Sequence, residues 1–131
     1  MGMYTELHLN AELRKDTPAG VVRLLDAMCD GATEPAPGLE IPGHALFRTI
    51  RWPYMLCCAS YYFAAQTHSE VYRDPLGLLY LCIRCNLKNY DNEIELFLDW
   101  IDQYIDAQKG EFLGFKRYEE ENEPTLIYKK A

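Results

Sequence analysis

The clearest pattern in the chain is a strict alternation of apolar and polar side chains near residue 80. The apolar series is Leu79, Leu81, Ile83, Cys85 and Leu87, and the polar series between them is Tyr80, Cys82, Arg84, Asn86 and Lys88. Successive side chains of a β-strand point to opposite faces of the sheet. The pattern therefore predicts a strand over 78–88 that has one core face and one polar face.

Three further segments in the first part of the chain are typical of strands. Residues 4–13 alternate with the same period of two, so they predict a half-buried strand. Tyr54–Phe63 is rich in aromatic and other strand-favouring residues and predicts a buried strand, and Ser69–Arg73 predicts a short one. The turn Asp74–Gly77 would join this short strand to the alternating one, because proline fixes φ and glycine accepts positive φ.

Two segments show helical spacing instead. Apolar residues from Val21 to Met28 recur at three and four positions, after the possible N-caps Asp16 and Thr17 and before Gly31, which predicts a helix. A second helix is expected from a cap at Asp91 to a stop at Gly110. The segment between the first helix and Gly43 contains three prolines and is expected to be a loop.

The end of the chain predicts a hairpin. Phe112–Glu119 and Thr125–Lys129 would pair across the acidic turn Glu119–Glu123. The expected order is then β-α-β-β-β-α-β-β, within a single domain of 131 residues. This order predicts an α+β fold in which two helices cover one face of an antiparallel sheet. The more specific expectation is a ferredoxin-like plait with an added strand or hairpin.

Charge and composition narrow the possible partners. The chain has 13 basic and 20 acidic residues and a formal net charge of −7, so we expect neither duplex nucleic acid nor an anionic membrane surface as a partner. A local basic patch could still hold a small anion. The first residues lack the basic and apolar regions of a signal peptide, and five cysteines without an export signal favour free thiols and a cytoplasmic location.

The cysteine and histidine patterns do not indicate a metal site. Cys82 and Cys85 would point to opposite faces of their strand, so the two thiols cannot share one metal. The three histidines, His8, His44 and His68, are far apart in the sequence and form no ligand motif. We therefore expect no metal and no other cofactor.

Aromatic content is the most distinctive positive feature. Ten tyrosines and two tryptophans accompany several arginines, and these side chains together can stack on planar rings and bind phosphate or carboxylate. The hypothesis is a pocket for a planar anionic small molecule. Its candidate residues are Tyr80, Arg84, Lys88, Arg51, Trp52, Tyr62 and His8. The same residue types are common at protein interfaces, so a homo-oligomer contact is the alternative interpretation.

Three segments carry a resemblance to a known family. Residues 51–58, 83–95 and 123–128 are similar to those of small proteins from phages and prophage-bearing bacteria. The family has no established catalytic residues to transfer to this chain. The resemblance implies a setting of phage–host interaction, in which small non-enzymatic proteins bind host proteins or sequester nucleotide-derived immune signals.

The leading expectation is thus a non-catalytic binding protein that forms a homo-oligomer, with an anti-defence role implied by the resemblance. The first alternative is an interaction module that binds a host protein through the polar sheet face. The second alternative is a small hydrolase of nucleotide-like substrates, in which His8 or His68 would act with Glu6 or Glu70.

Overall fold

The computed structural model describes residues 3–31, 38–60, 63–64 and 66–131. In this part of the chain, two α-helices and a five-stranded antiparallel sheet form an α+β fold, as predicted. The strands are β1 (Thr5–Glu12), β2 (Glu70–Arg73), β3 (Leu79–Leu87), β4 (Phe112–Tyr118) and β5 (Thr125–Tyr128). The helices are α1 (Ala19–Asp30) and α2 (Glu93–Ile101), and three short 3₁₀ helices are η1 (Ala45–Arg48), η2 (Met55–Cys57) and η3 (Asp102–Tyr104).

The strand order in the sheet is β2-β3-β1-β4-β5. The central strand β1 pairs with β3 on one side and with β4 on the other, and both pairs are antiparallel. Apart from the 3₁₀ helices, the elements from β1 to β4 follow the order β-α-β-β-α-β that a ferredoxin-like plait has. The assignment to that plait, with β5 as the added strand, stays a prediction.

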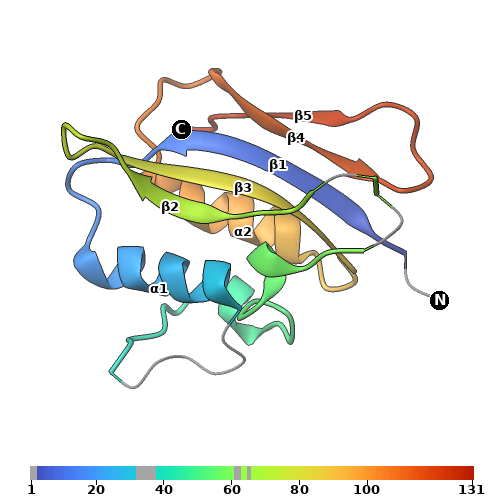
Figure 1. The fold of residues 1–131 in the computed structure, drawn as a ribbon, viewed down its shortest axis with the longest axis horizontal. Helices are drawn as coiled ribbons and strands as arrows, with labels where there is room; N and C mark the ends of the chain where they lie inside the picture. The colour runs from blue at the N-terminus through green and yellow to red at the C-terminus, as the bar shows by residue number, and fades with distance from the viewer. Residues whose placement is uncertain (1–2, 32–37, 61–62, 65) are drawn as a thin grey trace.

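Both helices cover the same face of the sheet (Figure 1). No described helix covers the other face (the open face), although Glu6 and Asn86 are buried at one end of it. The predicted phase of β3 is confirmed at Leu81, Ile83, Cys85 and Leu87, which are buried, and at Arg84, which is exposed; Asn86, expected on the polar face, is also buried. The β1–β3 pair places apolar side chains opposite each other, as in Leu7 opposite Cys85 and Leu9 opposite Ile83. The fully buried side chains of this core include Leu7, Leu9, Leu24, Leu25, Leu81, Ile83 and Phe97.

The predicted strand Tyr54–Phe63 is wrong in its described part. Residues 55–57 form η2, residues 58–60 have no regular structure, and Tyr61 and Tyr62 lie outside the described residues. Met55 and Leu56 are adjacent, and both are completely buried. A strand would send two adjacent side chains to opposite faces, whereas a 3₁₀ turn lets both enter the core. The observed order is therefore β-α-β-β-α-β-β.

The second helix differs from its prediction at both ends. Asn92, at φ 59°, precedes its first residue, and Asp91 does not cap it. The amide of Ile94 instead donates to the side chain of Asn89 (2.8 Å). The helix ends at Ile101, well before Gly110, and continues only as η3. Directly after η3, Ile105 forms an isolated antiparallel bridge with Leu13, and both side chains are buried in the core.

Candidate functional site: a basic pocket beside α1

Three of the predicted site residues share the open face of the sheet. His8 on β1 lies directly opposite Arg84 on β3, and Tyr80 is four residues before Arg84 on the same strand. The His8 ring stacks on Phe115, with 4.5 Å between the ring centroids. The Tyr80 hydroxyl donates to Asp74 (3.4 Å). These side chains lie on the same face of the sheet, the open face.

The other predicted residues lie elsewhere. Lys88 follows the end of β3, and its ammonium lies 5.9 Å from the centroid of the Tyr4 ring. Trp52 is buried in the core on the helix side, where its ring meets Phe47 edge to face. Arg51 lies in the same helix layer, and Tyr62 is outside the described residues. The six described candidates are thus divided among the open face, the end of a strand and the helix layer.

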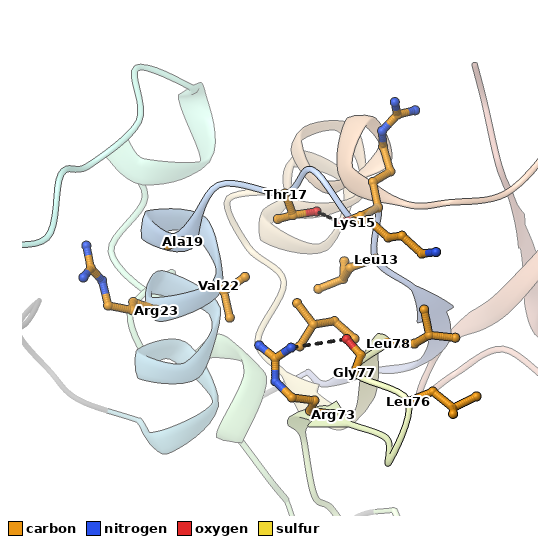
Figure 2. Close-up of a pocket in the computed structure, with 12 residues that line it drawn as sticks. Leu13, Lys15, Thr17, Ala19, Val22, Arg23, Arg73, Leu76, Gly77 and Leu78 are labelled. Atoms are coloured by element: carbon orange, nitrogen blue, oxygen red, sulfur yellow. Dashed lines mark hydrogen bonds between the residues drawn. The ribbon is translucent and has the colours of Figure 1, made fainter.

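A pocket that the sequence analysis missed lies between the start of α1, the end of β1 and the β2–β3 turn (Figure 2). Its volume is about 600 Å³. Four basic residues and no acidic residue occur among the described residues that line it. The basic residues are Arg14, Lys15, Arg23 and Arg73, and the apolar ones include Leu13, Val22, Leu78 and Leu79.

Backbone hydrogen bonds fix the two walls of this pocket. On one side, the amide of Leu13 donates to the Leu79 carbonyl (2.8 Å), which holds the segment after β1 against β3. Both the amide and the hydroxyl of Thr17 donate to the Arg14 carbonyl, which closes the turn into α1. On the other side, a carboxylate oxygen of Asp74 accepts the amides of Leu76 and Leu78 (2.9 Å each). Asx turns of this kind hold a loop without help from a ligand.

Arg73 is the basic side chain that reaches into the pocket. Its guanidinium donates to the Gly77 carbonyl (3.2 Å) and is turned toward the α1 side in Figure 2. Lys15 and Arg23 point away from the centre of the pocket in the same view. Arg14 is paired with Asp16 (3.1 Å), and both side chains are more than half exposed. An exposed ion pair is worth little, so Arg14 is free to turn toward an anion at low cost.

The start of α1 adds a partial positive charge to one side of the pocket. Its N-cap residue is Pro18, not Asp16 or Thr17 as predicted, and no side chain caps the first turn. The first turn also contains no acidic residue. A helix of 12 residues carries a partial positive charge at its first amides, which favours anions. Ala19, the first helical residue, lines the pocket.

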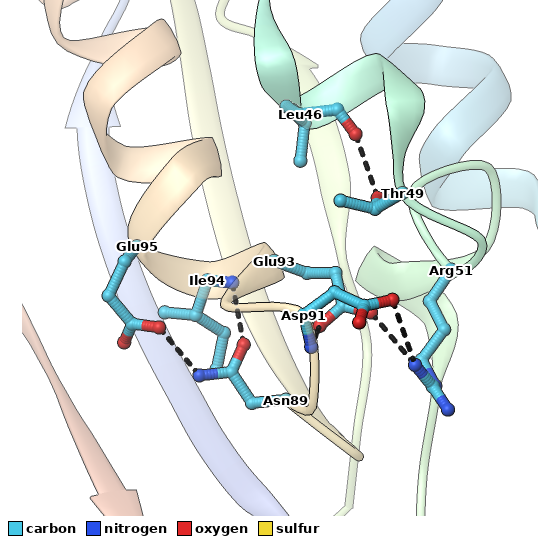
Figure 3. Close-up of polar contacts among 8 residues, drawn as sticks. All are labelled: Leu46, Thr49, Arg51, Asn89, Asp91, Glu93, Ile94 and Glu95. Atoms are coloured by element: carbon cyan, nitrogen blue, oxygen red, sulfur yellow. Dashed lines mark hydrogen bonds and ion pairs between the residues drawn. The ribbon is translucent and has the colours of Figure 1, made fainter.

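The guanidinium of Arg51 is already paired with carboxylates of the protein itself (Figure 3). Its guanidinium lies 3.1 Å from Glu93, whose side chain has no exposed surface, and 3.6 Å from Asp91. The same Glu93 accepts the amide of Asp91 (3.1 Å). The bond to Glu93 raises the pKa of Arg51. Arg51 therefore balances a buried charge that begins α2, which limits its use in ligand binding.

The cysteine thiols and the two histidine–glutamate pairs do not form a better candidate for a catalytic or metal site than the basic pocket does for a binding site. Burial raises the pKa of Cys29 to about 12 and that of Cys58 to about 11, so neither is an activated nucleophile. His68 lies 3.3 Å from Glu70, and both side chains are largely exposed. His8 lies 3.5 Å from Glu6, which also binds Arg117. No three His, Cys, Asp or Glu side chains in the described ranges are placed to share a metal ion.

Comparisons with known proteins found no family, no well-characterised protein and no solved structure that matches the chain. Among the described residues, no helix has the length and apolar character needed to cross a membrane. The functional interpretation therefore depends on the geometry of the chain itself.

Proposed function

We propose that the protein is a non-catalytic binding protein for a small anionic molecule, which it holds in the basic pocket beside α1. The main support for this proposal is the charge of the residues that line the pocket. Four of the 13 basic residues line the pocket, and none of its described lining residues is acidic, in a chain whose net charge is −7. On a surface that repels anions overall, such a concentration of positive charge supports a local anion site.

The shape and lining of the pocket support a ligand that is both anionic and partly apolar. Its volume of about 600 Å³ is within the usual range for small-molecule sites. Leu13, Val22 and Leu79 offer an apolar wall, on which a planar ring could lie. The guanidinium of Arg73 is planar, so it can bind phosphate with two parallel hydrogen bonds or stack on a ring. A nucleotide-derived small molecule combines these features.

The lining also favours binding over catalysis. Its described residues include no histidine, cysteine or carboxylate, the groups that most often act as bases, nucleophiles or metal ligands. The hydroxyl of Thr17 already donates to a backbone carbonyl. The anti-defence role implied by the phage resemblance, in which the ligand would be an immune signal, stays a prediction.

Thermal-shift measurements with matched anionic and neutral ligands test this function. We expect nucleotides to stabilise the protein and the corresponding nucleosides to do so much less. A ligand with micromolar affinity, present at about 100 µM, should add roughly 2 to 3 kcal/mol to the free energy of unfolding. If nucleotides and inorganic phosphates give no stabilisation at that concentration, the proposal is wrong.

A second candidate function, a protein interaction module, is favoured by the open face of the sheet. The rings of Tyr72 and Tyr80 lie side by side, 6.2 Å apart, and Arg84 is exposed on the same face. Tyrosine and arginine are enriched at the centres of protein interfaces. A partner that binds this face should be lost in Arg84→Ala and Tyr72→Ala and retained in Arg73→Gln, which changes only the pocket.

A further inference from the structure

A groove lies beside β5, away from the basic pocket. Its volume is about 530 Å³, within the usual range for small-molecule sites. Its described lining residues all differ from those of the basic pocket. They come from α2, from the turn before β4, from β4, and from β5 with the residue pair that follows it. The apolar side chains among them are Leu98, Leu126, Ile127 and Tyr128.

The floor of this β5 groove is aliphatic because β5 continues the core face of the sheet. Ile127 pairs with Gly114 on β4, and Gly114 pairs with Leu9 on β1, so the three residues share one face. Leu98 on α2 is only half-buried. A hydrocarbon chain that covers Leu98 and Ile127 would remove their remaining apolar surface from water, which favours binding.

Four lysines also line the groove, and two of them are already paired. The ammonium of Lys116 lies 2.5 Å from the carboxylate of Glu95, which lines the same groove. The ammonium of Lys129 is buried and lies 2.9 Å from Asp102. The positive charges of both lysines are therefore balanced by the protein itself.

The other two lysines, Lys109 and Lys130, make one end of the groove positive. Both are exposed, and neither has an ion-pair partner in the described part of the chain. The amide of Gly110 donates to the carbonyl of Lys129 (2.9 Å), so the neighbours of these two lysines are bonded to each other. The acidic residue closest in sequence to Lys109 is Glu111, which accepts a backbone amide (3.1 Å) and is not among the described lining residues.

The opposite end of the groove carries no unbalanced charge. Thr125 lies there, in register with Lys116, whose partner is Glu95. From Thr125 to Lys130 the chain spans roughly 17 Å at about 3.3 Å per residue. A positive end, an aliphatic floor and a balanced far end match the shape and charge of an elongated molecule with one anionic head.

We propose that the β5 groove binds a single-chain amphipathic anion, the chemical class to which the fatty acids belong. The head group is held by the ammonium groups of Lys109 and Lys130. The hydrocarbon chain runs along β5 over Leu98 and Ile127 toward Thr125. The aliphatic stems of the two lysines extend the apolar wall, because lysine keeps only its ammonium in water. This site is independent of the basic pocket, so either site can bind without the other.

Titration with decanoate, followed by two-dimensional ¹H–¹⁵N NMR, tests the proposal. Acetate and hexanoate are the shorter probes, and all three are kept below the concentrations at which they form micelles. We expect affinity to rise by up to about fourfold for each added CH₂ group that the groove buries. Decanoate should shift the amides of Leu98, Lys109 and residues 125–130. Affinity that does not depend on chain length, or shifts centred on the basic pocket, would overturn the proposal.

Variants of the two lysines test the position of the head group. Lys109→Gln and Lys130→Gln should each weaken decanoate binding about threefold and leave its dependence on chain length unchanged. Arg48→Gln is the matched control, since Arg48 is exposed on η1 and is not among the described lining residues. An equal loss in all three variants would show only an effect of overall charge and would contradict the assignment. Binding of phosphatidylglycerol vesicles or of an acidic peptide, without binding of decanoate, would assign the groove to a different partner and overturn the proposal.

Discussion

The guanidinium of Arg51 lies 3.1 Å from the carboxylate of Glu93, a side chain with no exposed surface. The two residues are 42 positions apart in the sequence, and their pairing attaches the segment before η2 to the start of α2. The Arg51 guanidinium also lies 5.2 Å from the centroid of the Tyr90 ring. Because Glu93 is buried, its charge depends on this one arginine for neutralisation.

Removal of Arg51 should therefore destabilise the fold more than removal of both charges. We expect Arg51→Met to lower the free energy of unfolding by about 3 to 5 kcal/mol, because a buried carboxylate loses its partner. The double variant Arg51→Met/Glu93→Met should recover most of that loss. Urea denaturation checks both values, with Arg84→Met on the open face as the control. Equal losses in the single and double variants would show that the pair has no such role.

Gly114 on β4 should tolerate no side chain. A Cβ atom at this position would lie 1.9 Å from the carbonyl oxygen of His8 on the neighbouring β1, so the two backbones would have to separate. We expect Gly114→Ala to cost at least about 2 kcal/mol, or to prevent folding. Gly20→Ala in the first turn of α1 is the matched control, since nothing lies within 4 Å of its added methyl group. Urea or thermal denaturation should show that control at or above wild-type stability.

The carboxylate of Asp102 makes the stability of the C-terminal segment depend on pH. Burial raises its pKa, but the amide of Lys130 and the ammonium of Lys129 (2.9 Å) outweigh burial, so the pKa is lowered from 3.8. A lowered pKa contributes stability above the unfolded-state value, and this is lost as the pH falls through the folded-state value. Asp102→Asn should thus be less stable than wild type at pH 7, and the difference should shrink below about pH 4. A difference that is constant between pH 7 and pH 3 in urea denaturation would contradict this assignment.

All five strands lie in segments that the sequence predicted, and the clearest signal was the alternation in two of them. Residues 79–87 and 5–12 alternate because each strand has one face on the core and one face away from it. Tyr54–Phe63 failed for the opposite reason, since its apolar residues are consecutive. Such a run fits a buried strand or a short helical turn equally well, and only the packing of Met55 and Leu56 against the core decides between them.

The pocket could not be predicted because its residues come from separate parts of the chain. Residues 13–23 and 73–79 become neighbours only when β3 pairs with the segment after β1. The available signal was weak, because the basic residues come from separate segments, with Arg14 and Lys15 before α1 and Arg73 at the end of β2. By contrast, the Arg, Tyr and Trp candidates were chosen for their residue type. Trp52 was expected to bind a ligand, and the structure places it in the core.

The role of Arg73 in the pocket gives the most specific prediction for ligand binding. Arg73→Gln keeps a side chain that can donate to the Gly77 carbonyl but removes the positive charge. We expect nucleotide affinity to fall about tenfold, which corresponds to about 1.4 kcal/mol. Arg84→Gln, which removes an exposed charge from the open face, should leave the affinity unchanged. Isothermal titration calorimetry compares the two variants, and an equal loss in both would show only an effect of overall charge.

Binding of an anion beside the start of α1 can be followed at each residue in a titration monitored by two-dimensional ¹H–¹⁵N NMR. Guanosine monophosphate is the probe and guanosine is its neutral control. We expect saturable shifts at the amides of Ala19, Gly20, Arg73 and Leu76–Leu79, which guanosine reproduces only weakly. Shifts centred on His8 and Arg84, or no saturable shifts at millimolar nucleotide, would contradict it.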